Sequence, residues 1–489
     1  MGEFGDYFKT WNWETGFRYS RNEGQNLSTG DVSQPGLRDA LLDTDPATAF
    51  NPFLGFLGQN SKAARSGVYV TLHNTGQFEL PLAYFHLNGD LFNLPAGPLS
   101  FAIGSEYRGE RMTRDRDSLN QTFSSIGSVD GQGFRANRDV WSIYEEVRVP
   151  FTSPTWNIPG FYSLEVDFAE REEWYSQNTS AVLSPFQPAT SSKYNAQKPK
   201  VSVRWQPLDP KYIGALTLRG SYSEAFHAPQ LFEMTPAGTQ DFVPVTDPFS
   251  TPTVYQIEER TSGNPFLRPE VAYEWTYGIV YSPKWLKGLT LSADWWHVHL
   301  RSLIFSFLGA ETFIANNPPP APPAVQNGPL VFRAPSDIPG VVGPVTLAIN
   351  PNVNVFEARF EGLDYEATYI LESSIFGHAD YGRLTFTLNG TWLSRAKFHP
   401  GFFGEDLIGI AGSFILGNSF PWHRANFTLY YDAPPDTWMQ GFDAGAVVHW
   451  TGQYNDDNAR KISAWTTLDL IVNYTFNLPP PAPASVPGL

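Results

Sequence analysis

The sequence predicts an all-β fold, an antiparallel up-and-down transmembrane β-barrel, and three observations lead to this prediction. Segments in which apolar and polar residues alternate recur roughly fourteen times, each about the ten residues that a tilted membrane-spanning strand requires. No comparable stretch shows the helical period. The connections between these segments alternate between short and long, which neither a sandwich nor a propeller has a reason to produce.

The composition of the 489-residue chain agrees with this fold. Aromatic residues make up 15% of the chain and charged residues only 17%, whereas a soluble domain usually carries about 25% charged residues. Gly and Pro number 41 each, too many for a helical protein of this length. The net charge of −16 argues against nucleic acid as a partner, and the absence of cysteine excludes disulfides, cysteine-ligated metals and thiol catalysis.

Each alternating segment has one apolar, often aromatic parity and one polar parity. In the first segment, the odd positions from Trp11 to Tyr19 are mostly aromatic and the even positions are polar or Gly. Lipid-facing residues at every second position are typical of membrane barrels and escape a hydropathy scan. The same alternation marks further strands at about 99–108, 162–168, 216–222, 273–281, 384–392, 442–450 and 468–476.

The lengths of the connections predict which ends of the strands share a rim. An up-and-down membrane barrel carries tight turns on its periplasmic rim and longer loops on its extracellular rim. Short, Pro- and Gly-rich turns are predicted at 152–160, 206–214, 282–288, 376–382 and 432–441. Long polar connections are predicted at about 109–138, 173–198, 224–270, 301–356 and 395–423.

The chain shows neither a signal peptide nor a membrane-spanning helix. Its first twenty residues lack a basic region followed by an apolar one, and no run of about 18 apolar residues occurs. A barrel needs an export signal, so we expect the true N-terminus to lie upstream.

Several motifs resemble those of the β-barrel portion of TonB-dependent outer-membrane receptors. GNPFLRPE, from Gly263 to Glu270, is similar to the family's GNP-x-L-K-PE signature, and YSEAFHAPQLFEM, from Tyr222 to Met234, is similar to its YS-x-x-FRAP-x-L-x-E stretch. His227 stands where the family usually has Arg. Segments 94–110, 361–369, 420–431 and 466–476 also look like barrel strands of these receptors. The motif residues, taken as structural, are Tyr222, Phe226, Ala228, Pro229, Gly263, Asn264, Pro265, Leu267, Pro269, Glu270, Glu274 and Gly278.

The resemblance implies an incomplete barrel of a receptor that imports a scarce ligand. Such receptors have 22 strands and an N-terminal plug, so residues 1–476 are expected to be part of the barrel and 477–489 a proline-rich loop segment leading to missing strands. The implied location is the outer membrane of a Gram-negative bacterium. The implied partners are outer-membrane lipid, the TonB complex through the missing N-terminal region, and a small molecule such as a siderophore or an oligosaccharide. No cofactor is implied, and the ligand-contacting residues stay unknown.

Two other functions are compatible with an all-β chain of this composition. One is a diffusion porin without a plug, and the other is a secreted carbohydrate-binding protein or enzyme. The chain carries none of the G-x-S-x-G, P-loop, H-E-x-x-H or dinucleotide motifs, so we expect no enzyme.

Local features that suggest metal sites have simpler interpretations. His297 and His299 share one face of a strand at a spacing compatible with a metal, but a place near the barrel rim beside girdle tryptophans is favoured. The charge run from Arg114 to Asp117 and the Asp130 segment are expected to be solvated loop, because the spacing beyond Asp130 fails the calcium-ligand pattern. We expect no bound metal.

Overall fold

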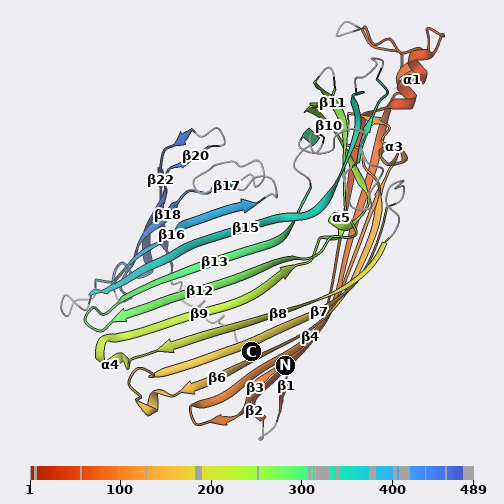
Figure 1. Cartoon of the computed structure of the whole chain (residues 1–489). Helices are drawn as coiled ribbons and strands as arrows, with labels where there is room; N and C mark the ends of the chain where they lie inside the picture. Colours follow the sequence, from red (N-terminus) through yellow and green to blue (C-terminus); the bar gives the residue numbers. More distant parts are fainter. Residues whose placement is uncertain are drawn as a thin grey trace, which may run out of the picture.

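One antiparallel sheet dominates the computed structural model (Figure 1). The structure describes residues 2–4, 8–54, 58–127, 129–181, 190–250, 253–306, 310–311, 314, 330–336, 342–373, 381–399, 405–406, 419–435, 437–456 and 460–476. The predicted proline-rich segments at 316–329 and 477–489 lie outside these residues.

Within the described residues, fourteen strands form the wall, and each pairs with the next wall strand along the chain. This confirms the predicted up-and-down topology. The wall strands are β2 (Phe8–Ser33), β3 (Tyr69–Leu94), β4 (Gly97–Arg116), β6 (Phe134–Thr152), β7 (Ser163–Ala181), β8 (Thr190–Gln206), β9 (Gly214–His227), β12 (Glu270–Pro283), β13 (Leu289–Ser306), β15 (Val345–Glu372), β16 (Arg383–His399), β18 (His423–Asp432), β19 (Phe442–Thr451) and β22 (Trp465–Tyr474).

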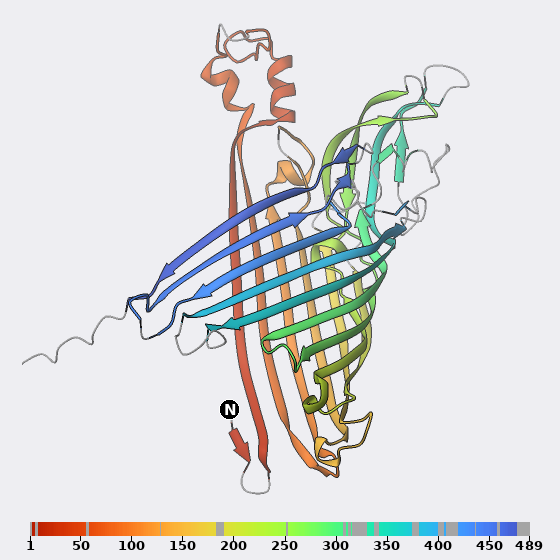
Figure 2. The ribbon, with the colours of Figure 1, turned by 90° about the vertical axis from the view of Figure 1, so that its left-hand side faces the viewer.

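The wall is strongly curved. Figure 2 shows the N-terminal strands running steeply and the C-terminal strands inclined to them, as the twist of a sheet requires. The short β1 (Gly2–Phe4) pairs with the start of β2. Among the described residues, β22 pairs with β19 and β2 pairs with β1, β3 and β5, and no pairing joins β2 to β22. None of the described helices is long and apolar enough to cross a membrane.

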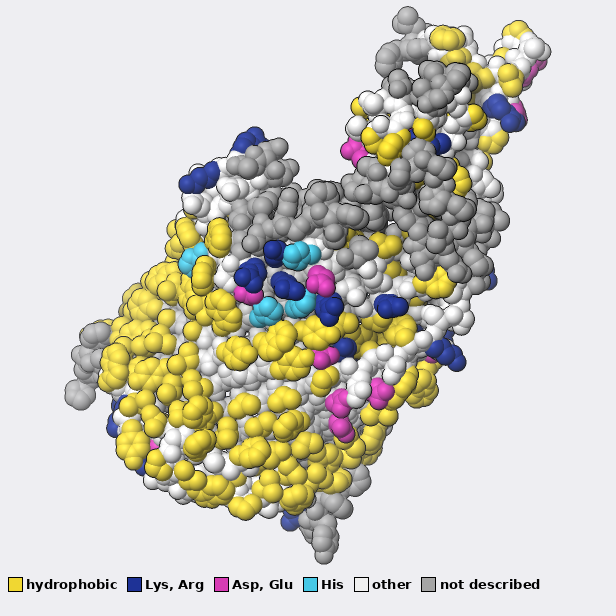
Figure 3. All heavy atoms as spheres, viewed as in Figure 1, with side chains coloured by type: hydrophobic (Ala, Val, Ile, Leu, Met, Phe, Trp, Pro, Cys, Tyr) yellow, Lys and Arg dark blue, Asp and Glu magenta, His cyan; other side chains and the backbone are white. Residues whose placement is uncertain are grey.

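Neighbouring register rows show that the two faces of the wall differ in chemistry. One row across β12, β13, β15 and β16 reads Tyr277, Trp295, Leu363 and Trp392. The next row lies on the opposite face, since side chains alternate along a strand. It reads Gly278, Asp294, Asp364 and Thr391. The apolar row belongs to the broad band of hydrophobic side chains on the outside of the wall (Figure 3).

Several strands are much longer than the ten residues expected for a membrane span. β2 and β3 contain 26 residues each, which is about 85 Å at the rise of a β-strand, against an apolar band about 25 Å tall. The predicted connection at 173–198 was therefore wrong, because most of it continues β7 and β8. These parts have polar residues on both faces, so the apolar alternation ends while the hydrogen-bonded ladder continues.

The ladder between β8 and β9 is unusually short. It covers Lys200–Trp205 on β8 and Leu218–Ser223 on β9. Above this section β8 pairs only with β7, and β9 pairs only with β12.

Tight turns close the wall at the rim opposite the long strand extensions. The turn after β12 contains Gly288 at a φ of 90°, where a Cβ atom would lie 2.1 Å from the carbonyl oxygen of Ile370. Only glycine fits such a site. The other turns include η2 (Pro154–Trp156) and α4 (Pro210–Ile213).

The long connections at the other rim contain their own small elements. They are α1 (Gln34–Leu42), α2 (Lys62–Ser66), α3 (Ser118–Gln121), β5 (Ser125–Ile126), α5 (Leu231–Met234), β10 (Gly238–Thr246), β11 (Val254–Ser262), β14 (Leu330–Arg333), β17 (Glu405–Asp406), β20 (Tyr454–Asn455) and β21 (Lys461–Ile462).

The strands β10, β11 and β14 form an extracellular unit with the upper end of β15. β11 runs parallel to β15, an exception to the antiparallel pairing of the wall. The unit has an apolar core that includes Val245, Ile257 and Ala348. Asp247 and Arg333 form a buried ion pair at 2.6 Å, and the hydroxyl of Tyr255 also donates to Asp247.

Removal of this buried carboxylate should loosen the extracellular unit. The Asp247→Ala variant is expected to lose roughly 3–5 kcal/mol of local stability, because Arg333 then stays buried without a carboxylate. Hydrogen exchange of the backbone amides in β10 and β11 measures this loss. Asp39→Ala, which breaks an exposed pair with Arg38, serves as a control and should change stability by less than about 1 kcal/mol. Unchanged protection of β10 and β11 would show that the pair does not hold the unit together.

Candidate ligand site

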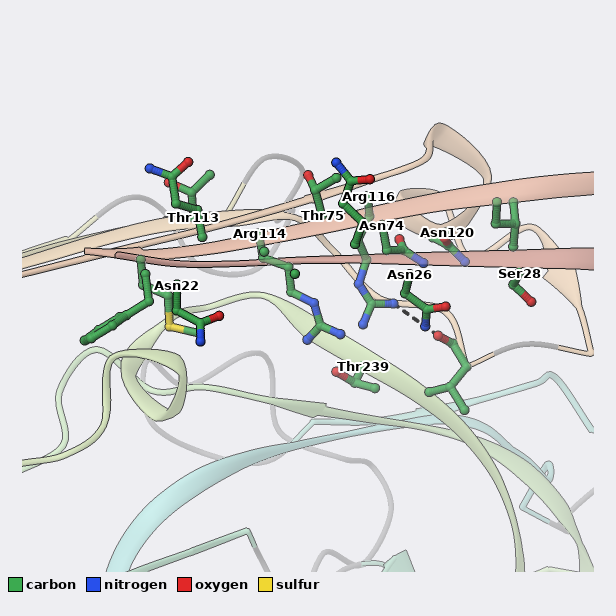
Figure 4. Close-up of a pocket in the computed structure, with 18 residues that line it drawn as sticks. Asn22, Asn26, Ser28, Asn74, Thr75, Thr113, Arg114, Arg116, Asn120 and Thr239 are labelled. Atoms are coloured by element: carbon green, nitrogen blue, oxygen red, sulfur yellow. Dashed lines mark hydrogen bonds between the residues drawn. The ribbon is translucent and has the colours of Figure 1, made fainter. Parts of the chain in front are cut away.

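A cavity of about 770 Å³, lined by polar side chains and by the apolar Leu72, Phe78, Met112 and Val129, lies against the inner face of β2, β3 and β4, near their ends at the rim of the long connections. Pairing brings Asn26, Asn74 and Arg116 into one register row across these strands, and Gly24, Gly76 and Arg114 into the row below. Figure 4 shows the side chains that face the cavity. They include Asn22, Asn26, Ser28, Asn74, Arg114, Arg116, Asn120 and Thr239.

Two glycines keep the space beside Arg114 open. A Cβ atom at Gly24 or at Gly76 would meet no atom within 4 Å. Because β2 and β3 have glycine in this row, no side chain fills the space next to the guanidinium of Arg114.

The two arginines of the cavity lack carboxylate partners. Within the part of the chain that the structure describes, Arg114 makes no ion pair, and Arg116 donates to the carbonyl of Val129 at 3.1 Å. The Nε of Arg116 is buried without a hydrogen-bond partner. Asp115 belongs to the other parity of β4, and Asp117, which lies just beyond the strand, accepts from the backbone N–H of His73.

Burial and mutual repulsion weaken the charged state of these two groups. Both lie beyond the aromatic pair Tyr107 and Trp141, on the extracellular side of the apolar band. Burial lowers the pKa of Arg114. Burial and the neighbouring charge of Arg114 lower the pKa of Arg116 to about 10, although Asp130 acts in the opposite direction. An incoming anion would relieve this repulsion, so the cavity is electrostatically prepared for a negative ligand.

A second cluster on the inner face is, by contrast, neutralised internally. It surrounds a cavity of about 970 Å³ next to the upper ends of β7, β8 and β9. Arg108 contacts Glu106 and Glu110, Arg138 contacts Glu110, Arg171 contacts Glu173, and Lys198 contacts Glu224. Four cations thus face four carboxylates, which leaves no surplus charge to attract an ion.

The fold, with its lipid-facing band and inner polar face, agrees with comparisons to known proteins. The family model described as "TonB dependent receptor-like, beta-barrel" matches residues 2–485. The chain belongs to this family. Its members are outer-membrane receptors and transporters and not enzymes, which confirms the predicted family. A comparison with curated protein sequences found no match.

The chain spans about half the length of three solved proteins with a similar fold. The ferripyoverdine receptor of Pseudomonas aeruginosa has a TM-score of 0.51 and 11% identity, over 96% of this chain and 48% of that one. A chain of the FpvAI–pyocin S2 complex has a TM-score of 0.51 and 12% identity, over 96% of this chain and 49% of that one. The ferric citrate transporter FecA in its unliganded form has a TM-score of 0.50 and 11% identity, over 97% of this chain and 53% of that one. Identities this low show a shared fold only.

The family-motif residues lie away from the Arg114 cavity, around the connection between β9 and β12. Asn264 is buried, its N–H donates to the carbonyl of Glu233 at 2.7 Å, and its side-chain amide donates to Asn352. Gly263 has no room for a Cβ atom, which would lie 2.1 Å from the carbonyl oxygen of Thr235. Tyr222 and Phe226 belong to β9, Ala228 and Pro229 follow it, Pro265, Leu267 and Pro269 lie in the turn before β12, and Glu270, Glu274 and Gly278 belong to β12.

Two of these motif residues connect strands directly. A carboxylate oxygen of Glu270 accepts from the N–H of Ile304 at 2.7 Å, and the other lies 3.2 Å from Nδ1 of His227, the residue that departs from the family pattern. Gly278 lies between Arg219 and Asp294, where a Cβ atom would be 1.9 Å from Asp294. The missing side chain lets these two residues form a bidentate ion pair at 2.6–2.7 Å.

The histidine pair of β13 contacts two different carboxylates. Nδ1 of His297 lies 3.0 Å from Glu361, and Nε2 of His299 lies 3.3 Å from Glu357. The ring of His297 packs against Trp275, at 5.2 Å between centroids. In the part of the chain that the structure describes, no group of three or more potential ligands could hold a metal ion.

The expectation of a solvated loop was wrong for Asp130, and it was also wrong for Arg114, Asp115 and Arg116, which belong to β4. The side chain of Asp130 is fully buried, accepts from Asn120 at 2.7 Å and also accepts from Ser125. Asn120 belongs to α3, which folds back over the cavity, and this tertiary contact leaves no signal in the local sequence.

Loss of one cavity arginine should stabilise the empty protein. Arg114→Gln removes one of two like charges, so the free energy of unfolding should rise by less than about 1 kcal/mol near pH 7.5. The pKa of Arg116 is lowered to about 10, so Arg116 loses its positive charge as the pH rises through that value. The repulsion between the two arginines of the wild type then disappears, and the difference in unfolding free energy between variant and wild type should shrink. Urea unfolding in detergent, followed by tryptophan fluorescence, measures both effects.

The matched control is Arg111→Gln on the same strand. Arg111 forms a 2.6 Å ion pair with Asp139, so this variant should lose stability instead of gaining it. If Arg114→Gln destabilised the protein at both pH values, the two guanidinium groups would not be in unfavourable contact.

Proposed function

We propose that the chain is the barrel part of an outer-membrane receptor that captures a small anionic ligand outside a Gram-negative cell. The observation that carries this proposal is the pair Arg114 and Arg116, which border a cavity lined in part by amides and make no ion pair within the described residues. The ligand is then moved inward with energy supplied through TonB, as the resemblance implies.

The chemistry of the cavity favours a ligand rich in carboxylate or phosphate oxygens. A guanidinium offers a planar set of N–H donors that matches such groups in bidentate geometry. The amides of Asn22, Asn26 and Asn74 can donate to and accept from hydroxyl and carbonyl groups of the same ligand. Two names among the compared proteins, ferric citrate transporter and ferripyoverdine receptor, refer to iron chelates. A negatively charged iron chelate is accordingly the ligand class that we propose, ahead of a neutral oligosaccharide.

The motif residues serve a structural role in this proposal. Gly263, Asn264 and Glu270 hold the connection between β9 and β12 against neighbouring elements, so the loops above the wall start from a fixed base. The broad apolar band on the outer face argues against a secreted carbohydrate-binding protein, which would expose it to water.

Binding of ferric citrate to the protein in detergent tests the ligand class. The Arg114→Gln/Arg116→Gln variant should bind it about a hundredfold more weakly, because two charge-assisted contacts worth about tenfold each are lost. Isothermal titration calorimetry measures the change, with maltotriose as a neutral probe.

The control variant is Arg111→Gln, on the outer parity of the same strand, and it should keep the wild-type affinity. Equal affinities of the wild type and the double variant for ferric citrate, or tighter binding of maltotriose, would contradict an anionic ligand at this cavity.

A further inference from the structure

A basic patch lies on the outer face of the wall, directly above the apolar band. We define the basic rim patch as Arg301, Arg359, Arg395 and Lys397 together with His297 and His299. Figure 3 shows basic and histidine side chains gathered above the hydrophobic band, over β13, β15 and β16. The patch was not recognised from the sequence, where only its two histidines stood out.

Strand register places the patch on the lipid-facing parity. One row reads Trp275, His297, Glu361 and Arg395, and the next reads Tyr273, His299, Arg359 and Lys397. The row below them on the same face is the apolar row that contains Trp295. Two residues along a strand span about 6.6–6.8 Å, so the outer surface changes from apolar to basic within that distance.

The patch lies at the extracellular boundary of the membrane. β13 runs from its tight turn at Leu289 to the long connection after Ser306, and His297 to Arg301 lie in its later half. Aromatic residues mark the boundary between lipid tails and headgroups in membrane barrels. Trp275, Trp295 and Trp392 occupy this position here.

The patch carries a surplus of positive charge in a chain with a net charge of −16. Its carboxylates are shared: Glu361 contacts His297 and Arg395, while Glu357 contacts His299, Arg301 and Arg359. Lys397 makes no ion pair within the described residues, although Asp406 of β17 is in register with it. Four permanent cations therefore face two carboxylates, or three with Asp406.

The outer face of the N-terminal strands shows no such surplus. Just beyond the aromatic pair of β4 and β6, ion pairs join Arg21 to Glu23 and Arg111 to Asp139, and Glu79 adds a third carboxylate. Arg135, which is in register with Thr113 of β4 on the same face, adds a third cation, so three cations face three carboxylates there. The positive surplus is thus local to β13, β15 and β16.

We propose that the basic rim patch binds the phosphate groups of an outer-leaflet lipid. A surface that faces lipid at this height meets headgroups and not the transported ligand. Phosphate is the anion whose oxygens match the fork of an arginine, and a lysine binds it as a point charge. The side chains of Arg301, Arg359 and Arg395 are 44–52% exposed, so their guanidinium groups can reach a headgroup beside the wall. The cavity of the proposed ligand lies on the inner face, and this inference does not depend on it.

The experiment titrates the detergent-solubilised protein with a diphosphorylated glycolipid of the outer leaflet and with the same lipid after dephosphorylation. Native mass spectrometry reads the bound fraction. The wild type should prefer the phosphorylated form, and Arg359→Gln/Lys397→Gln should weaken its binding about 25-fold, at about fivefold for each basic residue near a membrane surface. Inorganic phosphate at millimolar concentration should not compete.

The control is Arg21→Gln/Arg111→Gln, which removes two cations from the same face and should leave lipid binding unchanged. A heat-dependent shift in gel mobility shows whether the double variant of the patch is folded. If it is not folded, the single variant Lys397→Gln replaces it, because removal of this lysine leaves no carboxylate unpaired. A fivefold weakening of lipid binding is then expected. Equal binding of both lipid forms, equal loss in the control, or displacement by inorganic phosphate would overturn the proposal.

Discussion

The structure depends on one constraint, that a strand in lipid must satisfy its backbone N–H and C=O groups through neighbouring strands. The ladder from β2 to β22 pairs every interior strand with a neighbour on both sides, although β8 and β9 pair along only part of their lengths. Pairing in turn fixes the register, and register decides which side chains form rows across the wall. The cavity row of Arg114 and Arg116 and the outward row of Arg359 and Lys397 are both consequences of this ladder.

The sequence was sufficient for the fold because lipid imposes a period of two on the residues that it touches. Tyr277 and Ile279 alternate with Thr276 and Gly278 for this reason, and the alternation alone locates β12. Above the membrane the outer face meets water, and the period disappears. The extensions of β7 and β8, with polar residues such as Glu172 and Ser192, therefore escaped prediction, and so did the packed unit around Asp247.

The candidate site was harder to predict, since its parts come from distant segments. The run Arg114 to Asp117 was visible as alternating charge, but the identity of its inner face depends on pairing with β3. Gly24 and Gly76 contribute to the cavity because they have no side chain, and no local sequence pattern shows that such a position borders a cavity. The family motifs, in contrast, were readable because Gly263 and Asn264 act within a short connection. They identify the family and say nothing of the ligand.

The short ladder between β8 and β9 has a mechanical consequence. The backbone ladder of this pair covers only Lys200–Trp205 and Leu218–Ser223. Above it, the ion pair of Lys198 with Glu224 joins the two strands through side chains. The connection between β9 and β12 also spans the gap, because Arg138 of β6 donates to the carbonyl of Pro229 and the N–H of Gln132 donates to the carbonyl of Gly238 at 3.0 Å. The family-motif connection therefore takes the place of the missing ladder and couples the strands that carry the arginine cavity to the rest of the wall.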